Sequence, residues 1–167
     1  MKKLLIGLMI LFPLSAGASE VAFSPSGGAE ELVLKSIRGA DKSILLASYS
    51  FTSKEIAGEL ISASRRGVAI EVVADRSNLT ARYEATGVLV SAGIAVRYDG
   101  CYKIMHDKFM VIDGVRVETG SFNYTEAASH HNAENVLVIE DAGLARQYGV
   151  EWKRLWDESN ANGECVK

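Results

Sequence analysis

The chain lacks the short patterns that usually bind a catalytic or structural metal ion. It has no His-Glu-x-x-His, no Cys-x-x-Cys and no cluster of closely spaced carboxylates. Its apolar run at residues 4–14 is eleven residues long, short of the roughly 20 that a membrane-spanning helix needs. No linker, repeat or low-complexity segment divides the sequence. These absences count against a metalloenzyme and against a chain of several domains.

The N-terminus has the composition of a secretory signal. Two lysines precede the apolar run, and an Ala-Gly-Ala sequence at 16–18 matches the Ala-x-Ala pattern of a cleavage site. We therefore expect residues 1–18 to be a signal peptide, with a retained membrane anchor as the alternative. Cleavage would leave 167 − 18 = 149 residues, a single domain at 19–167 in the periplasm or outside the cell.

Hydrophobic periodicity alternates between the helical and the strand pattern along the rest of the chain. It predicts helices at 30–38, 53–66, 80–92 and 142–156, the second with Ser53 as its N-cap. Short apolar runs predict strands at 43–50, 68–74, 94–98 and 135–139. Helices that alternate with strands, followed by a hairpin, predict an α/β fold with a mixed β-sheet between helical layers.

The hairpin lies in the most informative segment, HDKFMVIDGVRVETGSFN at residues 106–123. Asp113-Gly114 separates two apolar runs, which is a strong signal for a tight turn between antiparallel strands, and the return strand is expected at 115–119. His106 and Lys108 are two residues apart in what we expect to be the first strand. Side chains at that spacing leave the same face, so an imidazole and an ammonium group would share one small volume.

The return strand ends at a second group of polar residues. Gly120 has no Cβ and lets backbone and hydroxyl donors approach an anion closely, Ser121 supplies a hydroxyl, and Asn123 adds an amide. We expect these groups to converge with His106 and Lys108 on one phosphoryl group.

This arrangement resembles the phospholipase D superfamily, whose pattern is His-x-Lys-x4-Asp-x6-Gly-Ser-x-Asn. The pattern falls without a gap on six residues of this chain: His106, Lys108, Asp113, Gly120, Ser121 and Asn123. The rest of the chain is similar to the small bacterial EDTA-resistant endonuclease branch. A carboxylate that such proteins carry eleven residues beyond the Asn is matched by Glu134.

The resemblance implies a phospholipase D-like fold and a transfer in two steps without a cofactor. One histidine attacks phosphorus, a second protonates the leaving alcohol, and water then releases the phosphate. The chain has one His-x-Lys, since His130 and His131 are adjacent, so the resemblance implies a homodimer in which two copies of His106 meet at a two-fold axis. Lys108, Asn123 and the Gly120-Ser121 pair would hold charge on the phosphoryl oxygens, and Glu134 would orient the His106 ring.

Two of these residues have simpler explanations that stay open. Asp113 is a motif position in the resemblance, but the Asp-Gly turn explains an aspartate there equally well. The His130-His131 pair is better explained as a solvated loop than as a metal site, because adjacent side chains on a strand point apart.

The chain has only two cysteines, Cys101 and Cys165, and both lie beyond the signal peptide. In an oxidising compartment we expect them to form a disulfide. Since Cys101 lies five residues before His106, a bridge between two subunits is the alternative.

Charge is the weakest support for a nucleic-acid substrate. The formal charge is −3, and loss of the two signal lysines takes it to −3 − 2 = −5, whereas proteins that hold DNA usually present a basic face. The negative net charge does not exclude a local basic patch on the surface. The basic residues that are candidates to surround the site are Arg65, Arg66, Arg76, Arg82 and Lys103. Three aromatic residues either stack on bases or pack in the core, namely Tyr49, Phe51 and Phe122.

Three functions from different classes follow. The first is a metal-independent endonuclease of low sequence specificity acting on DNA or RNA, because no base-reading module is visible. The second is a phospholipid phosphodiesterase, which is disfavoured because no basic amphipathic helix or long insertion is evident to bind a membrane or cover an acyl chain. The third is an inert binding module, against which the intact His106, Lys108 and Asn123 argue.

Overall fold

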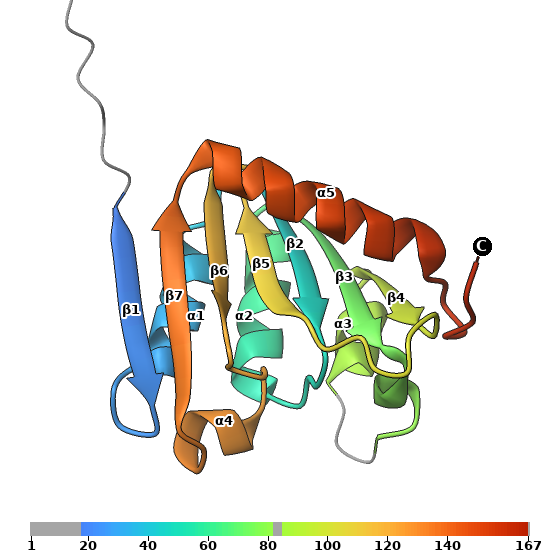
Figure 1. Ribbon diagram of the computed structural model, residues 1–167, viewed down its shortest axis with the longest axis horizontal. Helices are drawn as coiled ribbons and strands as arrows, with labels where there is room; N and C mark the ends of the chain where they lie inside the picture. The colour runs from blue at the N-terminus through green and yellow to red at the C-terminus, as the bar shows by residue number, and fades with distance from the viewer. Residues whose placement is uncertain (1–17, 82–84, 167) are drawn as a thin grey trace, which may run out of the picture.

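The computed structural model describes residues 18–81 and 85–166, so residues 1–17 of the expected signal peptide 1–18 and Arg82 lie outside the described residues. Strands and helices alternate through most of the chain (Figure 1). The strands are β1 (Ser19–Ser24), β2 (Ser43–Ser48), β3 (Ala69–Asp75), β4 (Ala95–Asp99), β5 (Lys108–Ile112), β6 (Arg116–Gly120) and β7 (Glu134–Glu140). The helices are α1 (Ala29–Arg38), α2 (Lys54–Arg65), the 3-10 helix η1 (Arg76–Leu79), α3 (Thr86–Ser91), α4 (Glu126–His130) and α5 (Ala142–Glu158).

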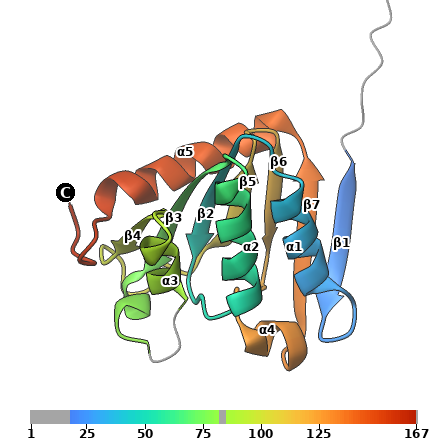
Figure 2. The same ribbon diagram turned by 180° about the vertical axis from the view of Figure 1, so that it is seen from behind.

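The strands form one mixed sheet in the order β1-β7-β6-β5-β2-β3-β4. Strands β2, β3 and β4 are parallel, and the remaining pairs are antiparallel. Helices α1, α2 and α3 cover one face, and α5 crosses the other (Figures 1 and 2). The expected α/β fold with a mixed sheet between helical layers is confirmed.

One end of the sheet collects the residues that the sequence predicts for the site, and we call it the site edge. It is formed by the C-terminal ends of β2, β3 and β6 and the N-terminal ends of β5 and β7, because Ser48 pairs with Lys108 and Gly120 pairs with Val136. Ligands of open α/β sheets usually bind at the carboxyl ends of the parallel strands, which lie at this edge.

Two parts of the secondary structure differ from expectation. The predicted helix at 80–92 is wrong in extent, since α3 begins only at Thr86. The chain before it is held by Asn78, whose side chain bonds to the backbone of Tyr49, Phe51 and Asp75, and this fixes the short η1 instead. The sequence patterns also missed β1, an edge strand, and the short α4.

Two hydrophobic clusters hold the layers together. The larger packs α1, α2 and α3 against the sheet, and the smaller lies under α5, where the Trp152 indole N–H donates to the Leu46 carbonyl at 2.9 Å. None of the helices within residues 18–81 and 85–166 is long and apolar enough to cross a membrane.

A carboxyl group is buried in the larger core. Glu118 on β6 is 1% exposed and accepts a hydrogen bond of 2.8 Å from the Tyr124 hydroxyl. Burial raises the pKa of Glu118 to about 8, and the hydrogen bond from Tyr124 only partly opposes this. The Tyr124 carbonyl accepts from the backbone N–H groups of Thr52 and Ser53, so the pair braces the segment that follows β6.

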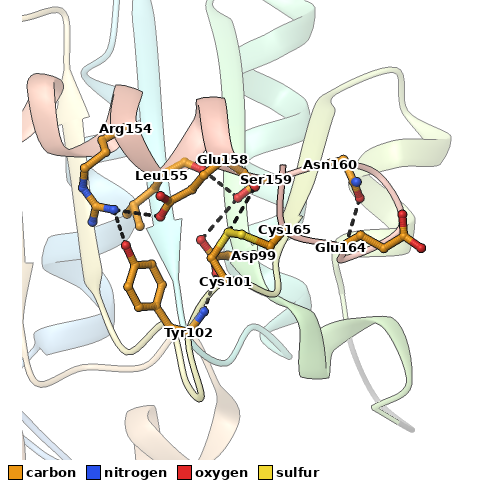
Figure 3. Close-up of a disulfide and its surroundings, with 10 residues drawn as sticks. All are labelled: Asp99, Cys101, Tyr102, Arg154, Leu155, Glu158, Ser159, Asn160, Glu164 and Cys165. Carbon is orange, nitrogen blue, oxygen red and sulfur yellow. Dashed lines mark hydrogen bonds and ion pairs between the residues drawn. A yellow bond between two sulfur atoms is a disulfide. The ribbon is translucent and has the colours of Figure 1, made fainter. Parts of the chain in front are cut away.

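The two cysteines form a disulfide within one chain. Cys101 follows β4, Cys165 lies in the C-terminal tail beyond α5, and their Cα atoms are 4.6 Å apart (Figure 3). The predicted Cys101–Cys165 pairing is therefore confirmed, and it closes the chain over 64 residues.

Replacing Glu118 by Gln should change how stability depends on pH. The folded carboxyl keeps its proton up to a pH of about 8, whereas the unfolded one loses it near 4.5, so its contribution is complete below 4.5 and is lost as pH rises through 8. The loss is at most about 1.4 kcal/mol per pH unit. Urea unfolding of Glu118→Gln and wild type between pH 5 and 9 should give diverging curves, and parallel curves would contradict the burial of a protonated carboxyl.

Removal of the disulfide should destabilise the fold. In the chain-entropy model a closure of 64 residues contributes about 4 kcal/mol to the free energy of unfolding. Urea unfolding of wild type and the double variant Cys101→Ala/Cys165→Ala measures this difference. Denatured, non-reduced wild type should show no reactive thiol, and two thiols per chain would refute the pairing.

Candidate active site

His106 lies in the loop between β4 and β5, which we call the 100–107 loop. The expectation that His106 belongs to the strand is wrong, since β5 begins at Lys108. The exposed His106 ring lies against Tyr49, with 4.6 Å between ring centroids. Lys108 Nζ donates to the His106 carbonyl at 2.6 Å and lies 5.3 Å from the centre of the Tyr49 ring. The imidazole and the ammonium group are therefore close, but through loop geometry rather than strand alternation.

Buried carboxylates hold the 100–107 loop in place of strand hydrogen bonds. Asp99 Oδ1 accepts from the N–H of Cys101 at 2.9 Å, and Asp75 Oδ2 accepts from the N–H of Met105 at 2.8 Å. Burial raises the pKa of Asp99, against the hydrogen bonds from the backbone of Cys101 and Tyr102. One anchor lies at each end of the loop, and the second is adjacent to His106.

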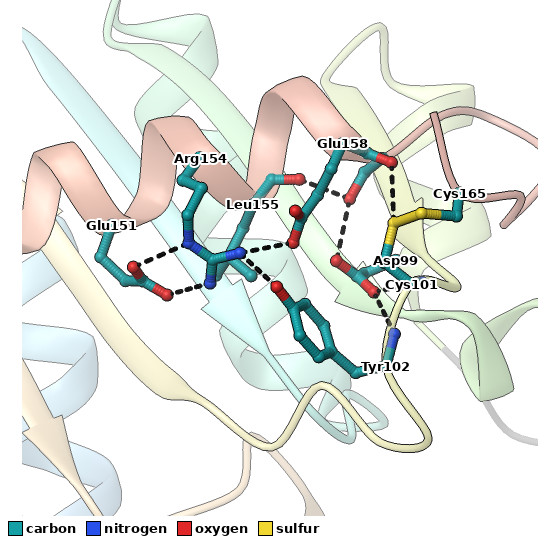
Figure 4. A network of polar contacts seen from close by, with 9 residues as sticks. Asp99, Cys101, Tyr102, Glu151, Arg154, Leu155, Glu158 and Cys165 are labelled. Atoms are coloured by element: carbon teal, nitrogen blue, oxygen red, sulfur yellow. Dashed lines mark hydrogen bonds and ion pairs between the residues drawn. A yellow bond between two sulfur atoms is a disulfide. The ribbon is translucent and has the colours of Figure 1, made fainter. Parts of the chain in front are cut away.

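Helix α5 adds a third anchor. The Arg154 guanidinium donates to the Tyr102 hydroxyl, to Glu158 at 2.8 Å and to Glu151 at 3.1 Å (Figure 4). The hydrogen bond from Arg154 lowers the pKa of Glu151 against the effect of burial. Exposed ion pairs of this kind contribute little to stability, so their effect is mainly to fix the loop relative to α5.

A pocket of about 610 Å³ opens beside the loop, and we call it the catalytic pocket. Its lining combines residues of the motif with residues of β6 and α5: His106, Asp107, Lys108, Phe109, Thr119, Gly120, Ser121, Leu144, Gln147, Tyr148 and Glu151. Lys108 is 8% exposed. Burial lowers the pKa of Lys108, while Asp107 and Glu134 act to raise it. The pocket thus presents one buried cation beside an accessible imidazole.

Gly120 and Ser121 meet β7 at the floor of this region. A Cβ on Gly120 would lie 2.1 Å from the Asn135 carbonyl oxygen, so only glycine fits there. The Ser121 hydroxyl donates to Glu134 Oε2 at 2.5 Å and accepts from the Asn135 N–H at 3.1 Å. Glu134 also accepts from Asn132 at 3.1 Å. The contacts of Glu134 in the described chain thus orient Ser121, where the sequence led us to expect contact with the His106 ring.

Asn123 follows on the same segment and has an unusual feature. Its Oδ1 is one of three buried side-chain atoms without a hydrogen-bond partner among the described residues. A buried amide oxygen normally has a donor, so this atom is free to accept one from a bound molecule or a partner chain. Binding of a phosphoryl oxygen would instead use the Nδ2 donors of Asn123, and that role stays a prediction.

Asp113 lies at the other end of β5, away from the catalytic pocket. Its φ is +56°, as a tight hairpin turn requires, and its carboxylate accepts from the backbone N–H groups of Asp41, Lys42 and Ser43. Burial acts to raise the pKa of Asp113, but these hydrogen bonds and Arg116 outweigh it, and the pKa is lowered. These contacts are those of a residue that fixes the hairpin, and they do not bring Asp113 to the catalytic group.

The remaining candidates separate into three groups. Arg76, Lys103 and Tyr49 line a second pocket next to His106. Arg65 and Arg66 lie at the far end of α2, where Arg66 bonds to the carbonyls of residues 37 and 38. The aromatic side chains in the core are Phe51 and Phe122, which are 0% and 1% exposed.

Sequence patterns missed Asp75 and the wall formed by α5. Asp75 has no motif neighbour, and it reaches the loop only because β3 ends beside it. The amphipathic pattern of 142–156 predicts a buried helix face, but it does not show that Leu144 and Tyr148 border a pocket.

One cluster within the described residues has metal-ligand geometry. The side-chain ligand atoms of Asp99, Cys101 and Glu158 lie within 4.8 Å of one another. However, the Cys101 sulfur is in the disulfide, and Asp99 accepts hydrogen bonds from the loop backbone. The residues of this cluster do not fit a thiolate metal site.

Comparison with known proteins finds relatives that are similar in sequence and in fold. The family described as "Cardiolipin synthase, PLD-like domain" matches residues 33–156. A phospholipase D of Rickettsia prowazekii is 37% identical over 148 residues, 89% of this chain and 72% of that protein. The mitochondrial cardiolipin hydrolase of Xenopus laevis is 34% identical over 160 residues, 90% of this chain and 76% of that protein.

Solved structures agree with these matches. Nuc of Salmonella typhimurium, a phospholipase D family member, superposes with a TM-score of 0.82 at 37% identity, covering 86% of this chain and 97% of that one. NucT of Helicobacter pylori shares the fold with a TM-score of 0.79 at 22% identity, covering 86% of this chain and 98% of that one. The chain therefore belongs to the phospholipase D superfamily and is a hydrolase that acts on phosphodiester bonds.

Proposed function

We propose that the protein is a metal-independent endonuclease of low sequence specificity that hydrolyses DNA, with RNA as the alternative polymer. The observation that carries this proposal is the exposed His106 beside the buried Lys108, in one pocket with Gly120 and Ser121. These groups supply a nucleophile and a fixed positive charge to a phosphodiester. The pocket lies on the surface, so a long polymer can pass across it.

The reaction proceeds in two steps and uses two histidines. An imidazole nitrogen of His106 bonds to phosphorus while the bond to the leaving oxygen breaks, and the imidazolium of His106 of the partner subunit gives that oxygen its proton. Water then attacks phosphorus, the phosphorus–nitrogen bond breaks, and a proton of the water passes to His106 of the partner subunit. Imidazole suits both roles because its neutral form is a nucleophile and its protonated form is an acid.

The fixed groups of the pocket stabilise the charge that this transfer concentrates on the phosphoryl oxygens. Lys108 is buried, so its charge acts in a medium of lower dielectric constant than water. The carboxylate of Glu134 holds the Ser121 hydroxyl, and the segment 120–123 is braced from below by Tyr124. The amide of Asn123 completes the set of groups that bind the phosphoryl oxygens.

The second histidine comes from a homodimer in this proposal. On the α5 side of the sheet, Val21 and Phe23 of β1 are 58% and 56% exposed, and Val21 pairs with Leu137 of β7. Leu137 pairs in turn with Thr119, which lines the catalytic pocket. Helix α5 leaves this part of the sheet open (Figure 1). An open apolar face that runs to the catalytic pocket suits a second copy whose His106 must reach the same phosphate.

We also propose that residues 1–18 are cleaved as a signal peptide and that the protein works in the periplasm or outside the cell. The disulfide supports this, because such bonds persist in oxidising compartments. The first strand, Ser19–Ser24, begins directly after the expected cleavage site.

A phospholipid phosphodiesterase is the second candidate. It is favoured by the relatives named phospholipase D and cardiolipin hydrolase and by the apolar wall that Phe109, Leu144 and Tyr148 add to the catalytic pocket. The endonuclease is preferred because the chain outside the motif, with Glu134, resembles the small bacterial EDTA-resistant endonuclease branch. In addition, no described insertion covers the pocket as an acyl chain would require.

Replacing His106 by Ala should abolish nicking of supercoiled plasmid by residues 19–167 in excess EDTA. Loss of the nucleophile should lower the rate by at least about 10³-fold, with folding and dimerisation unchanged. His130→Ala is the matched control, since the contacts of His130 are with Glu30 and Glu126. Phosphatidylcholine vesicles are assayed in parallel, and hydrolysis of vesicles without plasmid nicking would replace the endonuclease by the lipid enzyme.

Replacing Phe23 by Glu should break the dimer and reduce activity together. A charge on the open sheet face opposes its burial against a second copy. Sedimentation equilibrium measures the mass, and the specific nicking activity of the variant should rise with protein concentration. Val115→Glu places the same charge on an exposed residue of the β5–β6 turn and should change neither quantity. A monomeric wild type with full activity would contradict the shared site.

A further inference from the structure

A second pocket lies on the other side of the Tyr49–His106 contact, and we call it the flanking pocket. Its volume is about 450 Å³. Tyr49 lines this pocket while its ring touches His106, which lines the catalytic pocket. The other residues of its lining are Asp75, Arg76, Ser77, Leu79, Thr80, Lys103, Ile104, Asn162 and Gly163. A ligand with its reacting group at His106 can therefore extend along the site edge into this pocket.

The walls of the flanking pocket come from four segments that the fold holds together. These are the ends of β2 and β3 with η1, the 100–107 loop, and the C-terminal tail. The disulfide joins the tail to the loop (Figure 3). The backbones also meet closely, since a Cβ on Gly100 would lie 1.9 Å from the Gly163 carbonyl oxygen, and only glycine is accommodated there. The pocket is thus a built feature and not a gap between mobile loops.

The carboxylate at this pocket has hydrogen-bond partners, whereas its two cations have none in the described part of the chain. Asp75 is 4% exposed, and its two oxygens already accept from the Ser77 N–H and hydroxyl and from the Met105 N–H. Arg76 and Lys103 are exposed and have no hydrogen bond or ion pair within residues 18–81 and 85–166. Other basic side chains are paired with carboxylates, namely Lys35, Arg38, Arg66, Arg116, Lys153 and Arg154. Two uncompensated cations therefore border a pocket next to the nucleophile.

We propose that the flanking pocket binds a phosphate next to the scissile one on a polynucleotide. Arg76 and Lys103 pair with that phosphate, and the exposed Leu79 and Ile104, 42% and 47% accessible, contact the sugar or base between the two phosphates. This inference rests on the proposed endonuclease and gives it a substrate subsite.

A polynucleotide fits these observations better than a lipid in a membrane. The two pockets lie side by side along the site edge, so a ligand that fills both runs across the surface and places anionic groups beside the cations of each. A phospholipid in a bilayer presents its headgroup end-on, and phosphatidylcholine has one phosphate. A strand of DNA or RNA presents regularly spaced phosphates to a groove that follows the backbone.

The test compares a substrate that has one phosphate with a substrate that has several. Arg76→Ala, Lys103→Ala and the double variant are assayed with bis(p-nitrophenyl) phosphate and with a single-stranded oligothymidylate in EDTA. Each single variant should lower kcat/KM for the oligonucleotide by about tenfold, mainly through KM, because a charge-assisted contact is lost. With the one-phosphate substrate kcat/KM should stay within about twofold, since that substrate does not reach the flanking pocket.

Salt dependence and matched controls sharpen the result. The slope of log(kcat/KM) against log salt for the oligonucleotide should become shallower by about 0.7 for each cation removed. Arg65→Ala and Lys42→Ala remove the same charges from exposed positions at the opposite end of the fold and should behave as wild type.

Each outcome decides one part of the proposal. If wild type cleaves both substrates and the variants keep full oligonucleotide activity, the flanking subsite is refuted while the endonuclease stands. If wild type hydrolyses bis(p-nitrophenyl) phosphate but not the oligonucleotide, the endonuclease fails, and the polynucleotide subsite fails with it. In that case vesicles of phosphatidylcholine and of cardiolipin are assayed with the same variants, and a selective loss on cardiolipin would assign the pocket to a lipid phosphate.

Discussion

The hydrogen bond from the Met105 N–H to the buried Asp75 carboxylate ties the 100–107 loop to the sheet beside His106. His106 lies outside the strands, so its position depends on the anchors of the 100–107 loop and on its contacts with Tyr49 and Lys108. Asp99, the disulfide and the Arg154 network fix the start of that loop, and Asp75 fixes its end. An accessible histidine can in this way keep one position without being buried.

The same anchors shape the surface on both sides of His106. The loop separates the catalytic pocket, which α5 and β6 complete, from the flanking pocket, which η1 and the tail complete. Asp75 lines the flanking pocket, where it accepts from Ser77 in η1, and it also holds Met105, the neighbour of His106 in the catalytic pocket. In the proposed function, the catalytic group and the phosphate subsite would therefore both depend on one buried carboxylate. In the proposed homodimer, the open sheet face of β1 would also be covered by a second copy that supplies the other His106.

The sequence predicted the residues of the site better than their surroundings. The motif identified His106, Lys108, Gly120 and Ser121, which do line one pocket, and the Asp-Gly pattern located the hairpin. The strand prediction for His106 was wrong because local hydrophobic periodicity does not report the tertiary hydrogen bonds that hold the 100–107 loop. The roles of Asp75 and of α5 at the pocket could not be predicted from sequence patterns, because they arise from tertiary packing. For Asp113 the motif and the turn were both open explanations, and its contacts with residues 41–43 favour the turn.

In the proposed reaction, His106 becomes covalently phosphorylated in a site shared by two chains. Rapid quenching during turnover of bis(p-nitrophenyl) phosphate, followed by mass spectrometry of the intact protein and its peptides, tests this directly. We expect a nitrophenyl phosphoryl adduct on the peptide that contains His106, at no more than one per two chains, because the other histidine serves as acid. Turnover without an adduct on the quenched protein, or an adduct on a different residue, would contradict the account.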